Sequence, residues 1–279
     1  MILGLSSFTY GWSVGVPGNM PDRPLTVMDL ANRTKDFGLT CLQIGDNLPL
    51  HELQEEDLMA LKTFVIENNI RLEVGARKLT EDNLQHYINI AASMGSPLLR
   101  FVVDGDQYEP EGKTIIQTIK ATIPSLYESG VILGIENHDR FKAHELAAIM
   151  NVIDDRQVGI CLDCVNSLGA GEGLDYVVST LAPYTVNLHI KDYKIERLPH
   201  KMGFHVTGAP AGKGMTDVPM ILDKLAQYQR CDSAVLEQWV TPERMIEDTV
   251  KKEEDWAIEG VNYLKGLPYF GKQNMTITR

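Results

Sequence analysis

The sequence lacks any apolar run close to the ~20 residues that span a bilayer, so no transmembrane helix is expected in its 279 residues. Its first residues, MILGLSSFTYGW, lack both the basic segment and the cleavage-site pattern of a signal peptide. We therefore expect these residues to form the first strand of the fold, and we expect no membrane partner.

Positive charge and cysteine are both scarce. The formal net charge is −12 and the pI is about 5.0, which argues against binding of nucleic acid or of anionic membranes. The four cysteines include a CxxC pair, Cys161 and Cys164, but this pair lies within a predicted core strand, whereas a redox motif normally opens a helix. We therefore predict buried, reduced thiols and a cytoplasmic location.

Phosphate-binding motifs are absent as well. Residues 208–214 (GAPAGKG) come close to a P-loop, but the spacing is one residue short and Gly214 stands where a serine or threonine should hold magnesium. Residues 169–173 (GAGEG) do not match GxGxxG. Both segments are predicted to be mobile loops, and a serine nucleophile on a GxSxG elbow is not expected.

Strand-like and helix-like segments alternate along the chain without a linker. Short apolar runs, typical of buried parallel strands, lie at residues 2–7, 40–44, 71–74, 98–103, 131–136, 158–163, 185–190 and 234–239. Helix patterns follow at residues 25–37, 55–68, 80–94, 113–129, 143–152, 174–181, 217–228 and 245–264. Eight such units predict an α/β fold, a (β/α)8 TIM barrel over residues 1–270, with a polar tail at 271–279.

An open, doubly wound sheet is the alternative fold. It would normally show a phosphate-binding glycine turn after the first strand, which SSFTYGW does not provide. Within the barrel, Thr80 is predicted to cap the third helix and Pro124 to kink or split the fourth. Residues 11–24 and 191–215 are predicted to be long loops.

Four consecutive predicted strands end on a carboxylate or an imidazole. The segments GIEN, GICLD, NLHIKD and AVLEQ carry Glu136, Asp163, His189 and Glu237. Each alone has an ordinary explanation, such as a helix cap, an ion pair or a core histidine. In a closed barrel, however, the four converge at one end, and three carboxylates in a partly dry site repel one another unless a cation is present.

The predicted cofactor is therefore a divalent metal held by Glu136, Asp163, His189 and Glu237. One imidazole and three carboxylates make a hard, oxygen-rich site that favours Mn²⁺, Mg²⁺ or Co²⁺, with Zn²⁺ as an alternative. A metal beside a carbonyl acidifies the neighbouring carbon and stabilises an enediolate, so proton transfer next to a carbonyl is the predicted chemistry.

The order Glu–Asp–His–Glu resembles that of the sugar phosphate isomerase/epimerase family, a group of xylose isomerase-like TIM barrels. The resemblance covers essentially the whole chain, through LGLSSFTYGW, IENH, ICLD, HIKD, GKGMTD and VLEQ. It implies a metal-dependent isomerase or epimerase of a keto sugar, sugar acid or sugar phosphate. It also implies that Glu136 and Glu237 are catalytic and transfer the proton through a metal-stabilised enediolate.

Two positions depart from the pattern of ketose epimerases in this family. Asn166 and Lys142 stand where those enzymes carry a histidine and a second glutamate. This departure favours an alternative, a metal-dependent lyase on the same scaffold. It would be a 3-oxo sugar acid decarboxylase, similar to the 3-oxoisoapionate decarboxylases, or a 3-keto-glycoside eliminase. A sugar-binding barrel without catalysis is a third hypothesis.

Basic residues near the predicted metal suggest a small anionic substrate, although a neutral sugar stays open. The segment 191–215 is rich in lysine and arginine in an otherwise acidic chain, and a solvated loop is the alternative explanation. The predicted substrate-binding residues are Lys191, Arg197, Arg100, His205, Trp12, Asn166 and His138. The sequence also leaves a homo-oligomer open.

Overall fold

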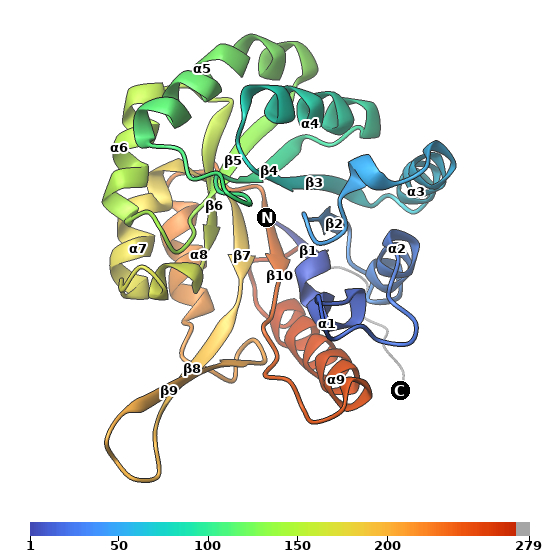
Figure 1. The fold of residues 1–279 in the computed structure, drawn as a ribbon, viewed down its shortest axis with the longest axis vertical. Helices are drawn as coiled ribbons and strands as arrows, with labels where there is room; N and C mark the ends of the chain where they lie inside the picture. The colour runs from blue at the N-terminus through green and yellow to red at the C-terminus, as the bar shows by residue number, and fades with distance from the viewer. Residues whose placement is uncertain (272–279) are drawn as a thin grey trace.

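Eight parallel strands close into a barrel in the computed structural model, which describes residues 1–271 (Figure 1). Around the barrel the strands follow the order β1-β10-β7-β6-β5-β4-β3-β2. Every residue of β2, β4, β6, β7 and β10 is buried, as is usual for parallel strands covered on both faces. The strands are β1 (Ile2–Ser6), β2 (Cys41–Ile44), β3 (Arg71–Arg77), β4 (Leu98–Val102), β5 (Ile132–Glu136), β6 (Val158–Asp163), β7 (Thr185–Ile190) and β10 (Ser233–Leu236).

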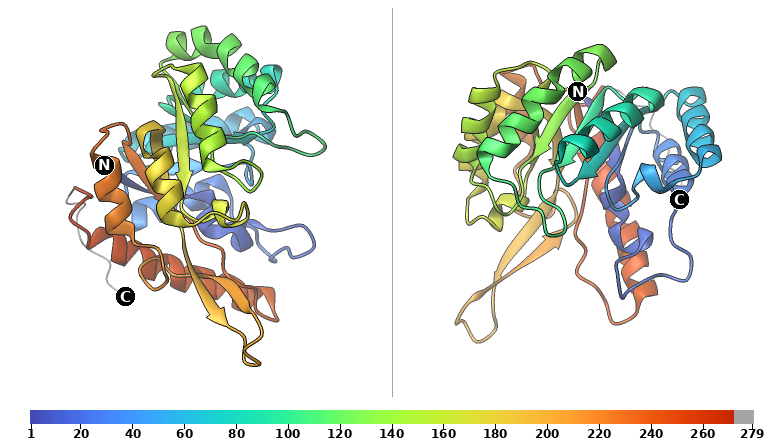
Figure 2. Two further views of the ribbon diagram at one scale, coloured as in Figure 1. Left: turned by 90° about the vertical axis from the view of Figure 1, so that its left-hand side faces the viewer. Right: turned by 45° about the horizontal axis from the view of Figure 1, so that its top comes forward.

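Helices surround this barrel, which confirms the predicted (β/α)8 fold (Figure 2). They are α1 (Gly11–Val14), α2 (Val27–Asp36), α3 (Glu55–Glu67), α4 (Glu81–Met94), α5 (Gly112–Ser129), α6 (Ala143–Ile153), α7 (Leu174–Leu181), α8 (Val218–Ala226) and α9 (Ile246–Lys265). Within residues 1–271, none of these helices has the length and apolar character of a membrane span. The predicted polar tail lies, from residue 272 onward, outside the described residues.

Two helix predictions have different outcomes. The Thr80 hydroxyl accepts a hydrogen bond from the backbone N–H of Asn83, so the predicted cap of α4 is confirmed. Pro124 lies inside α5, which continues through it as one helix, so the predicted split is wrong, while the kink stays a prediction. The apolar face of α5, with Ile119 and Leu126 buried against the barrel, stabilises the helix on both sides of the proline, and tertiary packing of this kind overrides local propensity.

The segment 191–215 is not the predicted long loop. It contains an antiparallel hairpin of β8 (Asp192–Arg197) and β9 (Phe204–Ala209), which projects from the barrel (Figures 1 and 2). Ile195 pairs with Val206 across the hairpin, and such β-branched residues favour strands. On β8, the charged residues Lys194, Glu196 and Arg197 occupy exposed positions.

The near-P-loop segment binds a carboxylate of the protein itself. Asp192, the first residue of β8, accepts hydrogen bonds from the backbone N–H groups of Gly212, Gly214 and Thr216 at 2.8–2.9 Å. A Cβ atom at Gly214 would lie 2.2 Å from Asp192 Oδ1, so only glycine fits there. The glycine-rich turn therefore closes the root of the hairpin.

Glu253 of α9 holds the short helix α1 against α9. Its carboxylate accepts hydrogen bonds from the backbone N–H of Trp12 and from the N–H and hydroxyl of Ser13, at 2.6–2.9 Å. Residues 11–15 (GWSVG) do fit the GxSxG pattern, but Ser13 is buried and bonded to Glu253, and within residues 1–271 its hydroxyl has no histidine partner. Burial raises the pKa of Glu253 to about 7, because its effect is larger than that of the hydrogen bonds from Trp12 and Ser13, which lower the pKa.

We expect this glutamate to make stability depend on pH. Its pKa is about 7 in the folded protein and about 4.3 in an unfolded chain. Between these values the unfolded state releases the proton and the folded state keeps it, so stability falls as pH rises. The measurement is chemical denaturation at pH 4.5 and at pH 7.5. Between these two pH values the free energy of unfolding should decrease by about 3 kcal/mol more in the wild type than in Glu253→Gln. Exposed Glu247→Gln is the control, and parallel profiles for the wild type and Glu253→Gln would contradict the prediction.

Candidate metal centre and active site

The four residues predicted to bind a metal converge at the carboxyl end of the barrel. Glu136 and Asp163 end β5 and β6, His189 lies near the end of β7, and Glu237 follows β10; none is more than 3% exposed. His189 Nδ1 lies 3.3 Å from Glu237, 3.6 Å from Glu136 and 3.8 Å from Asp163. The structure thus brings together side chains from four separate strands.

Their free atoms fit a divalent cation. His189 Nδ1 is buried and has no hydrogen-bond partner among the described residues, while Asp163 Oδ2 and Glu237 Oε2 are buried and face the Lys191 ammonium group. Ligand atoms of these three residues lie within 4.8 Å of one another. A buried polar atom without a partner is costly, and a hard cation bound by the two carboxylates and the imidazole would satisfy His189 Nδ1.

The histidine ring is oriented by a glutamine from the opposite side of the barrel. His189 Nε2 lies 2.7 Å from Gln43 Oε1, and because an amide oxygen only accepts, Nε2 carries the proton. Glu73 accepts from the Gln43 amide at 3.0 Å, which fixes that amide. In the neutral imidazole, Nδ1 therefore presents its lone pair to the side of the carboxylates, the arrangement expected of a metal-binding histidine.

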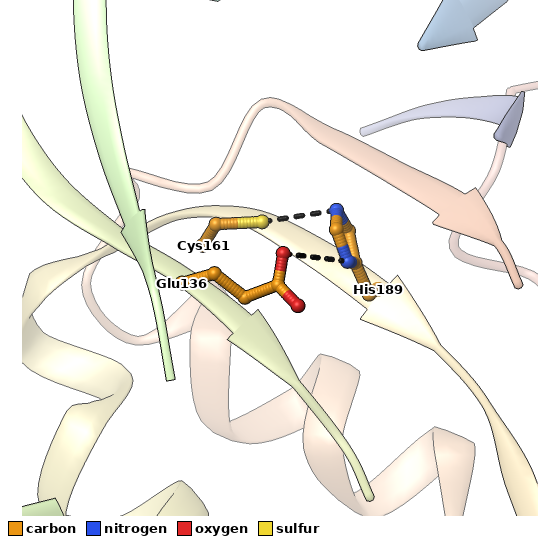
Figure 3. A group of neighbouring side chains, drawn as sticks. All are labelled: Glu136, Cys161 and His189. Atoms are coloured by element: carbon orange, nitrogen blue, oxygen red, sulfur yellow. Dashed lines mark hydrogen bonds and ion pairs between the residues drawn. The ribbon is translucent and has the colours of Figure 1, made fainter. Parts of the chain in front are cut away.

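Cys161 lies beside the same ring, as Figure 3 shows for Glu136, Cys161 and His189. Its sulfur is 3.0 Å from His189 Nε2, whereas Glu136 faces Nδ1. Burial raises the pKa of the Cys161 thiol, so the thiol stays protonated. This opposes a soft thiolate ligand and leaves Glu136, Asp163, His189 and Glu237 as the proposed donor set.

Lys191 extends its ammonium group into the centre. Its Nζ lies 2.7 Å from Asp163 Oδ2, 3.0 Å from Glu237 Oε2 and 3.4 Å from Asn166 Oδ1. Burial lowers the pKa of Lys191, but Asp163 and Glu237 outweigh it and hold the pKa above its usual value. Lys191 therefore carries a positive charge at the mouth of the proposed metal centre.

Arg100 binds two carboxylates at once. It is 4% exposed, and its guanidinium donates hydrogen bonds to Glu136 and to Asp46. Burial raises the pKa of Asp46, but the positive charge of Arg100 more than offsets this, and Arg77 adds to the decrease. Glu136 is also bonded by the Asn166 amide at 2.8 Å, so both of its oxygens are engaged.

A cleft of about 150 Å³ opens onto these groups. Of the predicted substrate-binding residues, Arg100, His138, Asn166 and Lys191 line it, and they do so together with the proposed catalytic pair Glu136 and Glu237. Phe8, Asp46 and Arg77 line it as well. Sequence reasoning missed Asp46, Arg77 and the supporting residues Gln43 and Glu73.

The other three predicted contacts are not among the residues that line the cleft. Trp12 donates its indole N–H to the Val240 carbonyl at 2.8 Å. Arg197 and His205 are exposed on the hairpin, where the Arg197 guanidinium stacks on Phe204 at 4.4 Å. Because β8 and β9 form a hairpin that projects from the barrel, they carry both side chains away from the barrel mouth.

We expect divalent metal to stabilise the protein through this centre. Saturation at about a hundred times Kd adds about 2.7 kcal/mol to the free energy of unfolding, or roughly 5 °C in Tm for a chain of this size. The shift in Tm is measured by differential scanning fluorimetry of EDTA-treated protein, with and without added Mg²⁺ or Mn²⁺. Asp163→Asn should abolish the shift, and an equal shift in this variant would place the ion elsewhere.

Comparisons with known proteins agree with this architecture. The 3-oxo-isoapionate decarboxylase of Pectobacterium atrosepticum is 26% identical over 264 residues, which cover 95% of each chain. A D-psicose 3-epimerase from Clostridium cellulolyticum H10, solved with D-tagatose, superposes with a TM-score of 0.69 at 15% identity, over 95% of this chain and 97% of that one.

A xylose isomerase-like TIM barrel protein from Mycobacterium smegmatis, solved in complex with magnesium, has a TM-score of 0.66 at 12% identity. The match covers 94% of this chain and 97% of that one. At such low identity the solved structures show the fold alone. The family model described as Xylose isomerase-like TIM barrel, however, matches residues 19–267. The chain therefore belongs to the xylose isomerase-like TIM barrel family.

Proposed function

We propose that the protein is a divalent-metal-dependent lyase that decarboxylates a 3-oxo sugar acid. The observation that carries this proposal is the contact of Arg100 with Glu136. Both oxygens of Glu136 accept hydrogen bonds, one from Arg100 and the other from Asn166, and these contacts compete with a reaction in which the carboxylate must begin by removing a proton from carbon. Decarboxylation begins without a base, because the electrons of the breaking bond move into the carbonyl group.

The charges that line the cleft support an acidic substrate. Arg77, Arg100 and Lys191 line the cleft together with three carboxylates, Asp46, Glu136 and Glu237. A divalent cation bound by the carboxylates would leave a net positive charge, and arginine in particular pairs well with carboxylates. The similarity to a 3-oxo-isoapionate decarboxylase along 95% of both chains points to the same class of substrate. The oxygen-rich donor set suits Mg²⁺, Mn²⁺ or Co²⁺.

Each group in the site then has a definite part. A divalent cation, when bound, supplies Lewis acidity at the carbonyl oxygen of the substrate. Lys191 adds its positive charge where negative charge develops as the carbon–carbon bond breaks and carbon dioxide leaves. The enolate carbon then takes up a proton, which the Lys191 ammonium group is positioned to donate, since arginine does not release one. Lys191 then regains a proton from solvent. Buried walls around Glu136 and Glu237 limit the access of water.

The test is release of carbon dioxide from 3-oxo sugar acids, measured with the metal-loaded protein and again after EDTA. One equivalent of carbon dioxide per substrate, lost with EDTA and restored by metal, is the expected result. Its absence from a panel of such acids would contradict the lyase proposal.

Epimerisation is the second candidate, because Glu136 and Glu237 line the same cleft and approach His189 at 3.6 and 3.3 Å. Two carboxylates around one substrate carbon can remove and return its proton. Metal-dependent exchange of the carbon-bound proton with solvent deuterium, without loss of carbon dioxide, would favour this reaction.

A further inference from the structure

A second and larger cavity adjoins the catalytic cleft at the carboxyl ends of β2 and β3. Its volume is about 800 Å³, and Asp46 and Arg77 line both spaces. We propose that this cavity binds an uncharged, hydroxyl-rich group of the substrate, such as a second sugar residue joined to the reacting sugar acid. The inference rests on the proposed function for the reacting end of that substrate.

The size of the catalytic cleft is the first argument. At about 150 Å³ it lies below the roughly 300–1,000 Å³ of typical small-molecule sites, whereas the adjoining cavity falls within that range. Asp46 joins the two, because one of its oxygens accepts from Arg100 and the other lies 3.4 Å from Arg77. A substrate seated at the metal centre can therefore continue past this residue.

The walls of the cavity carry aromatic rings with polar edges. His51, His86 and Tyr87 all line it, and their ring centroids lie 5.5–6.1 Å apart in edge-on contact. The Tyr87 hydroxyl is 2.6 Å from His51 Nδ1, which fixes both rings. Rings of this kind offer an apolar body and a polar tip to a ligand.

The balance of charge selects the ligand. Asp46, Glu52, Asp82 and Asp106 line the cavity against two cations, Arg77 and Lys78. Arg77 is already engaged by Asp46 and by the Asp104 carbonyl. Carboxylates only accept hydrogen bonds, so they suit hydroxyl donors and repel a further anion. An uncharged polyol fits this lining.

The floor of the cavity has an unusual backbone. Lys78 has a φ of 71°, a left-handed conformation that is uncommon and costly for residues other than glycine. Its N–H is held by the carbonyls of Val102 and Asp104, and a Cβ at Gly105 would lie 2.5 Å from the Lys78 Cβ. Strain of this kind concentrates at functional sites, which agrees with a binding role for the cavity.

Kinetics with two substrates test the proposal. One is a 3-oxo sugar acid, and the other is the same acid with a glucosyl group on the end opposite the carboxylate. His86→Ala should raise KM for the glucosylated acid about tenfold, without changing kcat or the kinetics of the short acid. His144→Ala, which removes an exposed imidazole outside the cavity, is the matched control. Equal effects of His86→Ala on both substrates would overturn the proposal.

A binding measurement separates this proposal from the proposed reaction. The imidazole NMR signals of the seven histidines are followed in the full-length protein with Mg²⁺, during titration with maltobionate or with gluconate. Maltobionate should shift the signals of His51 and His86, and gluconate should leave them unchanged. If the shifts occur but no acid releases carbon dioxide, the lyase proposal fails and the binding site stands. If maltobionate shifts neither signal, the site proposal fails.

Discussion

Glu237→Gln is expected to reduce turnover about a thousandfold, the scale seen when one charge-stabilising group is removed from an active site. The Glu237 carboxylate lies 3.3 Å from His189 Nδ1 and accepts a hydrogen bond from Ser6 at 2.7 Å. The amide retains the shape of the side chain but loses its negative charge. The site would then hold a divalent cation with one anionic ligand fewer, and metal affinity should fall together with kcat.

The measurement is steady-state decarboxylation at saturating metal, with metal affinity from isothermal titration calorimetry. Glu259→Gln is the matched control, because that carboxylate is 46% exposed and pairs with Lys213; it should retain wild-type turnover. Near-normal activity of Glu237→Gln at every metal concentration would exclude Glu237 from the centre. Circular dichroism would verify that the variant is folded.

Lys191→Met is expected to lower kcat about a hundredfold, within the range for loss of a group that transfers a proton. Its ammonium lies between Asp163 and Glu237, and methionine fills similar space without the charge. Metal affinity should be maintained or increased, because the ammonium competes with a metal ion for the same two carboxylates. Loss of turnover with retained metal binding distinguishes this residue from the ligands.

Lys194→Met provides the control for Lys191→Met. Lys194 lies on β8, three residues further along the chain, and its side chain is exposed, so its replacement should change neither kcat nor metal affinity. Wild-type kcat in Lys191→Met would contradict the role proposed for this lysine. Loss of metal binding in that variant would instead make Lys191 a structural element of the centre.

The barrel and its metal centre could be predicted because both follow local rules. Alternating apolar strands and amphipathic helices predict parallel strands, and parallel strands in a closed barrel present their carboxyl ends on one side. Glu136, Asp163, His189 and Glu237 could thus be placed together without knowledge of a single contact. The register of the sheet supports this, because Asp163 and His189 are paired on adjacent strands.

The residues that support this centre could not be found in the same way. Gln43 and Glu73 lie in the middle of short strands, where polar side chains carry no local signal of function. Gln43 contacts His189, which is 146 positions away in the chain. Only closure of the barrel brings these residues face to face, so the one signal available was a polar residue at a strand position expected to be apolar.

The hairpin was missed for a different reason. Charged residues alternate there with Ile195 and Val206, and the net positive charge of the segment outweighed this period-two pattern in the prediction of a loop. The same charge led to the placement of Arg197 and His205 at the substrate. Composition indicates what a segment attracts, but only its periodicity indicates where its side chains point.

The hydrogen bonds at Asp192 fix the point where the hairpin of β8 and β9 begins, directly after Lys191 of the proposed metal centre. Asp192 is the residue after Lys191, and three backbone N–H groups of the segment that follows β9 hold its carboxylate. Because these hydrogen bonds hold Asp192, a change in the length or composition of the hairpin need not displace the neighbouring Lys191. Substitutions at the tip of the hairpin are therefore expected to leave the position of Lys191 unchanged.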